Sequence, residues 1–166
     1  CMTFVSVSDG AWEGIDRTAY TGYDALKPFR DLNETHRFPY TPYWHGMAAL
    51  NAGSEMVLAP GLEETFKRHE AAAGRCRKAV TDMGFVLFPA AGAVASPTVT
   101  AVRVPETLAW TDLDRRLRQK GLVVGGSHGK LAGRVFRIGH MGSQADMALL
   151  TDALAVLADV AGSIIP

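Results

Sequence analysis

The sequence predicts an α/β (α+β) domain in which a three- to four-stranded, mainly antiparallel sheet carries helices on one face. At 166 residues the chain is long enough to bury a sizeable core. Between residues 62 and 83, apolar side chains recur at helical spacing. They are Leu62, Phe66, Ala73, Cys76, Val80 and Met83. Beyond Gly84 the order strand, strand, helix, strand, strand, helix follows, and this order predicts one sheet with helices packed on it.

The first 43 residues predict less regular structure. TFVSVS, residues 3–8, alternates apolar and hydroxyl side chains and predicts a strand. DGAWEGID predicts a short helix capped by Ser8 or Asp9. Residues 16–43 contain three prolines without a sustained period, so we expect an ordered connecting segment. Because domains usually begin with something looser, we also expect a portion of the protein upstream of Cys1.

The remaining elements follow in order along the chain. Helical spacing predicts a helix over residues 44–60, which Pro60 and Gly61 end. The long helix then runs from Leu62 to Gly84. The runs FVLFP, TVTAVRV, LVVGG and RVFRI predict four strands, with a helix near LDRRLRQKG between the second and the third. A last helix is expected from about Gln144 to Ala161.

Composition excludes several classes of protein. Lysine plus arginine and aspartate plus glutamate each number 17, so the net charge is zero and attraction to nucleic acid or an anionic membrane is disfavoured. No apolar run approaches the roughly 20 residues of a membrane span. The chain opens without the pattern of a signal peptide. We therefore expect a soluble, cytoplasmic protein, in which two cysteines form no disulfide framework.

Most candidate chemical motifs fail on spacing. GGSHGKLAG resembles a phosphate loop, but Val124 replaces a required glycine and Leu131 the hydroxyl residue that would reach magnesium. The five histidines never fall at metal-ligand spacing, so we expect no metal site. Cys76 lies on the apolar stripe of a helix, which favours a small buried hydrophobe over a nucleophile. No serine occupies a nucleophile elbow.

Arg137 stands out from this background. The strand RVFRI would present a rigid guanidinium, and Gly139 and Gly142 let the backbone after it bend and approach a ligand closely. A planar fork of donors is suited to gripping a carboxylate at two points. The alternative is ordinary, because arginines near strand ends are mostly surface residues or members of structural ion pairs.

These residues lie in a stretch with a family resemblance. RVFRIGHMG, preceded by GLVVGGSHGKLAG, resembles the C-terminal region of class V aminotransferases, in the alanine–glyoxylate and serine–pyruvate aminotransferase group. MTFVSVSDGAWE, FPYTPYWHGMAALNAG, GLEETFKRHEAAAGRCRKAV and SPTVTAVRVP match in the same order. The resemblance covers essentially the whole chain. It implies the C-terminal small domain of a fold-type-I enzyme that uses pyridoxal 5′-phosphate, together with the last part of the large domain.

The resemblance also implies an arrangement of domains and sites. Residues 1–43 would end the large cofactor-binding domain, 44–60 would form a linking helix, and 61–166 would form the small domain. The substrate-carboxylate arginine of the family falls on Arg137. Thr41 matches the threonine that reaches the cofactor phosphate of the partner subunit in a homodimer. At Phe38 the aromatic hydroxyl often found there is missing, although Tyr40 is nearby.

The resemblance leaves one essential residue unmatched. The family's Schiff-base lysine precedes the segment that matches MTFVSVS, and none of the five lysines of this chain has a matching context. We therefore expect the chain alone to bind no cofactor and to be inactive. Two hypotheses remain: the C-terminal part of an aminotransferase acting on alanine or serine and on glyoxylate or pyruvate, or a non-catalytic, stand-alone small domain acting as a binding or assembly module. The residues present do not fix the amino donor.

Overall fold

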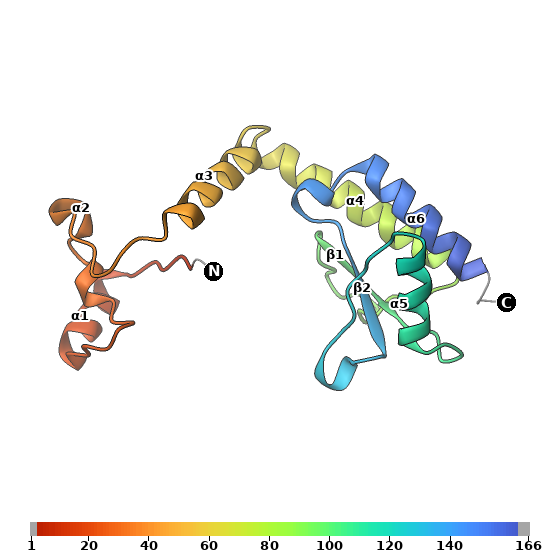
Figure 1. The fold of residues 1–166 in the computed structure, drawn as a ribbon, viewed down its shortest axis with the longest axis horizontal. Coiled ribbons are helices and arrows are strands. Elements are labelled where there is room, and N and C mark those ends of the chain that lie inside the picture. Colours follow the sequence, from red (N-terminus) through yellow and green to blue (C-terminus); the bar gives the residue numbers. More distant parts are fainter. Residues whose placement is uncertain (1–2, 163–166) are drawn as a thin grey trace. The chain divides into compact units, whose positions relative to one another are not determined.

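The computed structural model describes residues 3–162, and the chain divides into two units, Cys1–Met56 and Val57–Pro166 (Figure 1). In the first unit, helix α1 spans Asp9–Thr18 and α2 spans Leu32–Thr35, with a 3₁₀ turn at Lys27–Phe29 before α2. Helix α3 begins in this unit and spans Trp44–Leu58. The helices predicted at residues 9–16 and 44–60 are thus confirmed, and the predicted connecting segment contains two short helical turns.

Helix α1 begins where the capping pattern predicts. The Ser8 backbone is extended, and its side-chain oxygen accepts a hydrogen bond from the Ala11 backbone N–H at 3.3 Å. This contact satisfies one of the N–H groups that a helix leaves open in its first turn. The strand predicted just before it is wrong. Within the described chain, residues 3–7 pair with no other strand, and alternation alone does not make a strand without a backbone partner.

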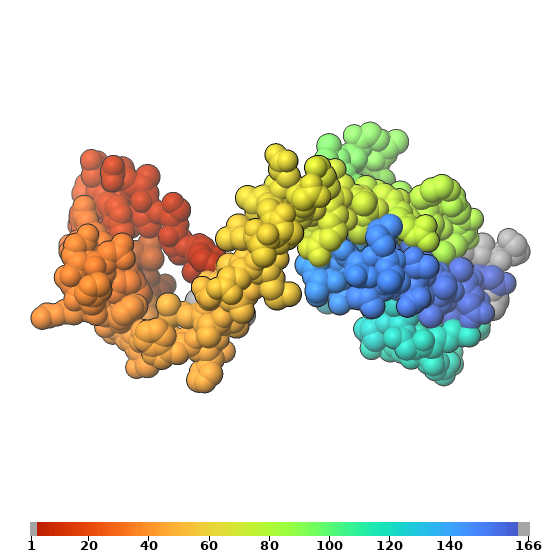
Figure 2. Space-filling view, turned by 90° about the horizontal axis from the view of Figure 1, so that it is seen from above, coloured from red at the N-terminus to blue at the C-terminus, as the bar shows by residue number. Residues whose placement is uncertain are grey.

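The described part of the second unit, residues 57–162, contains the helices α4, α5 and α6 and the strands β1 and β2. Helix α4 spans Leu62–Asp82, β1 spans Val99–Arg103 and α5 spans Trp110–Gln119. Strand β2 spans Val135–Gly139 and α6 spans Met147–Gly162, with short 3₁₀ turns before each of them. Helix α6 lies along α4 and also contacts α5 (Figure 2). No helix within residues 3–162 is long and apolar enough to cross a membrane.

The sheet is smaller than the sequence suggests. Strands β1 and β2 pair antiparallel, with Ala101 opposite Arg137. The two other predicted strands join them through single bridges only, Leu87 to Val102 and Gly125 to Arg137. Pairing beyond Leu87 and Phe88 stops near Pro89, which has no N–H to donate. The antiparallel arrangement is therefore confirmed, as two strands with one bridged segment at each edge.

The helices cover one face of this sheet, as predicted. Thr100 and Val102 of β1 and Phe136 and Ile138 of β2 alternate onto that face and are at most 6% exposed. Each helix adds buried apolar side chains to the same core. They include Cys76 and Val80 of α4, Leu113 and Leu117 of α5, and Leu150, Leu154 and Leu157 of α6.

The buried stripe of α4 differs in part from the predicted one. Ala73, Cys76 and Val80 are buried, but Leu62 and Phe66 are 49% and 60% exposed. Thr65 and His69 are buried in the first half of the helix instead. Both polar side chains are hydrogen-bonded, so burial costs them little. The spacing of apolar residues cannot predict the burial of Thr65 and His69, because these side chains are buried against polar backbone groups.

Candidate functional site

Arg137 lies on the sheet face opposite the helices. Its neighbours Phe136 and Ile138 in β2 are buried against the helices, and successive strand residues point to opposite faces. The Arg137 side chain is accordingly exposed. Its backbone is held by the bridged edge segment: Arg137 N donates to Gly125 O at 2.7 Å, and Gly125 N donates to Arg137 O at 3.0 Å. A regular strand with a hydrogen-bonded neighbour thus fixes where the side chain leaves the sheet.

The Arg137 guanidinium is oriented by a backbone carbonyl. Nε and Nη2 both donate to the carbonyl oxygen of Gly126, at 3.0 and 2.6 Å. These two donors form one edge of the planar group, so the terminal edge with Nη1 and the second Nη2 hydrogen forms no hydrogen bond within the described chain. The terminal edge is thus left as a fork of donors that can bind a carboxylate at two points.

The charge of Arg137 also has no counter-ion among the described residues. No carboxylate of residues 3–162 lies within ion-pair distance of it, whereas Arg115 and Arg118 pair with Asp112 and Asp114. A carbonyl partner is neutral and leaves the positive charge uncompensated. The structural ion pair considered as the ordinary explanation of Arg137 is therefore missing from the described chain, and the group is free to take a small anion.

Two buried histidines hold the loop that follows Arg137. His140 Nε2 lies 2.9 Å from Thr100 Oγ1, and burial lowers the pKa of His140. Gly142 N donates to His69 Nε2 at 2.9 Å, while His69 Nδ1 lies 2.7 Å from the carbonyl oxygen of Thr65. Because Nε2 accepts, Nδ1 must carry the proton and donate to Thr65. Gly142 adopts φ +58°, a conformation that suits glycine.

Tyr40 and Thr41 belong to the first unit and are both exposed. The Tyr40 ring stacks on Tyr23 at a centroid distance of 4.8 Å and meets Phe29 edge-on at 5.5 Å. It also lines a cavity of about 450 Å³ with Trp12 and other apolar residues. Neither the Tyr40 nor the Thr41 hydroxyl has a hydrogen-bond partner in the described chain. Both can therefore serve an external acceptor such as a phosphate oxygen.

The lysines are in settings unsuited to imine formation. A lysine nucleophile needs a lowered pKa, which burial or a neighbouring positive charge provides. All five lysines are exposed, and only Lys130 makes no ion pair in the described chain. The four ion pairs are Lys27–Asp16, Lys67–Glu64, Lys78–Asp82 and Lys120–Asp159. These four amines are therefore already engaged in surface ion pairs.

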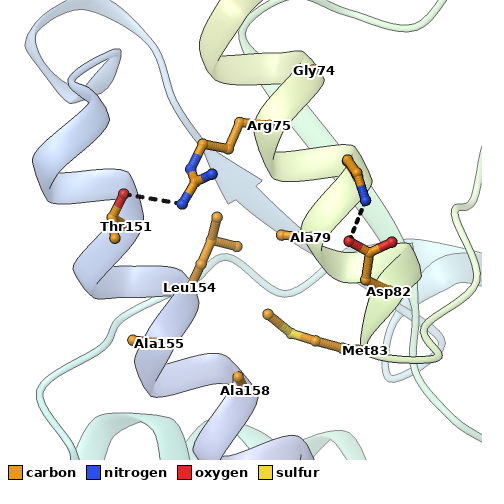
Figure 3. Close-up of a pocket in the computed structure, with 10 residues that line it drawn as sticks. Gly74, Arg75, Ala79, Asp82, Met83, Thr151, Leu154, Ala155 and Ala158 are labelled. Atoms are coloured by element: carbon orange, nitrogen blue, oxygen red, sulfur yellow. Dashed lines mark hydrogen bonds and ion pairs between the residues drawn. The ribbon is translucent and has the colours of Figure 1, made fainter.

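The other candidate sites carry less chemistry. A groove of about 680 Å³ lies between α4 and α6, where Arg75 donates to Thr151 at 3.4 Å and Lys78 pairs with Asp82 (Figure 3). Its charged groups are thus already partnered. Cys76 is a buried, free cysteine, and burial raises the pKa of its thiol, which favours the unreactive form. No group of three or more metal-ligating side chains gathers within the described residues.

Comparison with known proteins gives the family. No family model matches the chain. The L-aspartate–glyoxylate aminotransferase of Paracoccus denitrificans is 40% identical over 158 residues, which cover 93% of this chain and 38% of that enzyme. An uncharacterized aminotransferase of Methanocaldococcus jannaschii is 37% identical over 145 residues, covering 85% of this chain and 37% of the relative.

A solved structure agrees with the sequence matches. The pyridoxamine–pyruvate aminotransferase from Mesorhizobium loti superposes with a TM-score of 0.86 at 29% identity, over 95% of this chain and 42% of that enzyme. The sequence matches and the fold agree on one family of proteins. It belongs to the class V aminotransferases, as the resemblance of its motifs indicated. It spans about two fifths of the length of these relatives, which is consistent with their C-terminal portion.

Proposed function

We propose that this chain is the C-terminal part of an aminotransferase that moves an amino group between alanine or serine and glyoxylate or pyruvate. The observation that carries the proposal is Arg137, a charged fork on an open sheet face without a counter-ion in the described chain. Glyoxylate and pyruvate are named as substrates of related enzymes. Both are small carboxylates of the kind that an arginine fork binds.

Arg137 would bind the substrate carboxylate through its terminal edge. The Gly126 carbonyl already occupies the Nε side of the guanidinium, so a ligand can take Nη1 and Nη2 without displacing a protein contact. Two parallel charge-assisted hydrogen bonds would fix both the position and the rotation of the carboxylate. Arg137 would then hold the carboxylate that all these substrates share, and other residues would select the substrate side chain.

Pyridoxal 5′-phosphate would be the cofactor of the whole enzyme, to which it supplies an electron sink. The free hydroxyls of Thr41 and Tyr40 fit the phosphate as donors. The lysines do not fit the aldehyde, because all are exposed and four are ion-paired. We therefore propose that the chain alone does not transaminate. In this proposal residues 1–43 form the end of the large domain. Residues 44–60 form the helix that links the two domains, and residues 61–166 form the small domain.

The proposed enzyme is a homodimer. Helix α3 buries none of its residues, and the aromatic side chains around its start are open to solvent. Phe38, Tyr43 and Trp44 are 45%, 59% and 61% exposed. Exposed aromatic residues of this kind are typical of the centre of a protein interface. A two-fold partner that covers them would place Thr41 beside the other subunit, as the family resemblance implies.

The test is turnover. The 166-residue chain and any longer protein that contains it are each supplied with pyridoxal phosphate and assayed with alanine plus glyoxylate, then serine plus pyruvate. We expect turnover from a longer form that contains a cofactor-binding lysine, and none from the short chain. Turnover by the short chain would refute its proposed inactivity. A longer form that is inactive with both pairs would refute the substrates.

The alternative function, a binding or assembly module, has one observation in its favour. The second unit has its own buried core, including Phe136, Leu113 and Leu157, and so does not need a cofactor domain in order to be built. The two functions differ in the partner they require. Affinity purification of the tagged chain from its own cells would recover a protein with the cofactor lysine in the first case. If the chain is a binding or assembly module, the purification would recover it without a protein that carries the cofactor lysine.

A further inference from the structure

The loop beside Arg137 contains two adjacent glycines whose presence the backbone does not explain. Gly125 and Gly126 are not among the glycines with positive φ, so an L-residue could adopt their backbone conformation. What distinguishes them is the space beside each. A Cβ on Gly126 would lie 3.0, 3.2 and 3.3 Å from Nε1, Cε2 and Cζ2 of Trp110.

The matching atom at Gly125 would meet a different neighbour. A Cβ there would lie 3.5 Å from Nη2 and 3.8 Å from Nε of Arg137, which is ordinary van der Waals contact. Beside the Trp110 indole, a side chain at position 126 would make short contacts, while position 125 has room for a methyl group. The indole is itself held by stacking on buried Phe136, at a centroid distance of 5.8 Å and an interplanar angle of 15°.

These contacts form one chain of support. Phe136 fixes Trp110, Trp110 lies against Gly126, and the Gly126 carbonyl accepts from Nε and Nη2 of Arg137. We infer that Gly126 is a positioning residue whose carbonyl aims the Arg137 guanidinium and reserves its Nη1/Nη2 edge for the ligand, and that the Trp110 indole requires a glycine at this position. This inference deepens the proposed function and rests on it for the identity of the ligand as a small carboxylate.

The test uses the Arg137 Nε–H as a reporter in the intact chain, followed by NMR of ¹⁵N-labelled arginine. A hydrogen-bonded Nε–H should exchange with water about 10-fold more slowly than that of Arg103, which is exposed and makes no side-chain hydrogen bond in the described chain. In Gly126→Ala we expect this protection to be lost, since the added methyl group and the Trp110 indole must move apart by a few tenths of an ångström.

Two further variants separate positioning from a general loss of structure. Gly125→Ala is the matched control: it adds the same methyl group one residue away without a short contact, so the protection should persist. Gly126→Ala combined with Trp110→Leu removes all three crowding atoms and should restore it. The amide signals of Val102 and Ile138 report whether the core is intact. If Gly126→Ala alone fails to fold, the double variant decides, because a folded protein with an unprotected Nε–H would contradict the inference.

Pyruvate is the probe for the reserved edge. We expect it to shift the Arg137 side-chain signals while the Nε–H stays protected, because the terminal edge binds without displacing Gly126. If the Arg137 Nε–H exchanged faster in the pyruvate-bound protein, the assignment of the Nη1/Nη2 edge to the ligand would be refuted. Protection retained in Gly126→Ala would refute the positioning role. Pyruvate that shifts no Arg137 signal would instead refute the proposed carboxylate role, while the exchange data still decide on the positioning.

Discussion

The two units of this chain differ in how they bury their residues. In the second unit, Phe136, Leu113, Leu117 and Leu157 are almost fully buried within one continuous cluster. In the first unit, Ala25 is the one buried residue among those described. Phe4 and Tyr23 of that unit are 78% and 82% exposed. The first unit therefore has helices and aromatic residues but almost no core of its own.

This difference indicates how each unit obtains its stability. Burial of apolar surface is the main favourable contribution to folding, and a region that buries almost none cannot offset its loss of conformational entropy. The second unit can meet this requirement with its own side chains. We expect the first unit to become stable only by packing against another protein surface, either that of a further domain or that of a second copy of the chain. Homology over only about two fifths of the relatives' length agrees with this expectation.

Dividing the chain gives the largest expected effect. Residues 57–166 expressed alone should unfold cooperatively in urea, because the second unit holds nearly all the buried residues. Residues 1–56 alone should show no cooperative transition. Far-UV circular dichroism during urea titration measures both. A sharp transition in the short fragment would show that the two units do not differ in this way.

Matched aromatic substitutions should sharpen the same contrast. Phe136→Ala removes a fully buried ring that contacts Phe85 and Trp110, and should destabilise the chain by about 3–5 kcal/mol. Phe4→Ala removes a ring that is 78% exposed and should change stability by no more than about 0.5 kcal/mol. Urea midpoints give both values, and equal losses would contradict the comparison.

Self-association should depend on the exposed start of α3. We expect dimers in analytical ultracentrifugation, and Trp44→Glu should weaken them at least about tenfold, since a charge would replace an aromatic anchor. Val94→Glu is the control, because Val94 is fully exposed in a loop of the second unit. A chain that is monomeric at every concentration, or that loses its dimer equally in both variants, would contradict this interface.

The smallest effect concerns pH. Burial, with help from nearby Arg77 and His69, lowers the pKa of His140 in the folded chain. The unfolded chain then takes up this proton first, so stability should fall as pH drops below about 6.5, by at most about 1.4 kcal/mol per pH unit. His140→Gln should flatten this dependence, whereas His45→Gln, at an exposed position, should not. Equal slopes in all three chains would show that His140 is not the source.

The elements that sequence predicted well are those set by local signals. Ser8 caps α1, and the helical spacing of apolar residues placed α4, because each signal acts within a few residues. The prediction of a strand at residues 3–8 was wrong, because a strand depends on a partner that sequence alternation does not reveal. The burial of His69 was missed for the same reason, since its partner Gly142 lies 73 residues further along the chain.

The site shows the same limit. The strand and the glycines after it predict Arg137 as a site residue, and the structure shows that it is an exposed residue of β2, while its role stays a prediction. The Gly126 carbonyl that orients it was not predicted, because the contact joins two segments 11 residues apart through the bridged edge. The adjacent pair Gly125 and Gly126 was the available signal. In the sequence this pair belongs to the failed phosphate-loop pattern and to the family resemblance, and neither assigns it a role.

One kinetic comparison tests the central claim most directly. In a catalytically complete form of the enzyme, Arg137→Ala should lower kcat/KM for the 2-oxo acid by about 30- to 1,000-fold, which corresponds to the loss of about 2–4 kcal/mol. Arg103→Ala, in the neighbouring strand and likewise exposed, should leave it nearly unchanged. Unchanged turnover in Arg137→Ala, or equal losses in both variants, would contradict a carboxylate-binding role for Arg137.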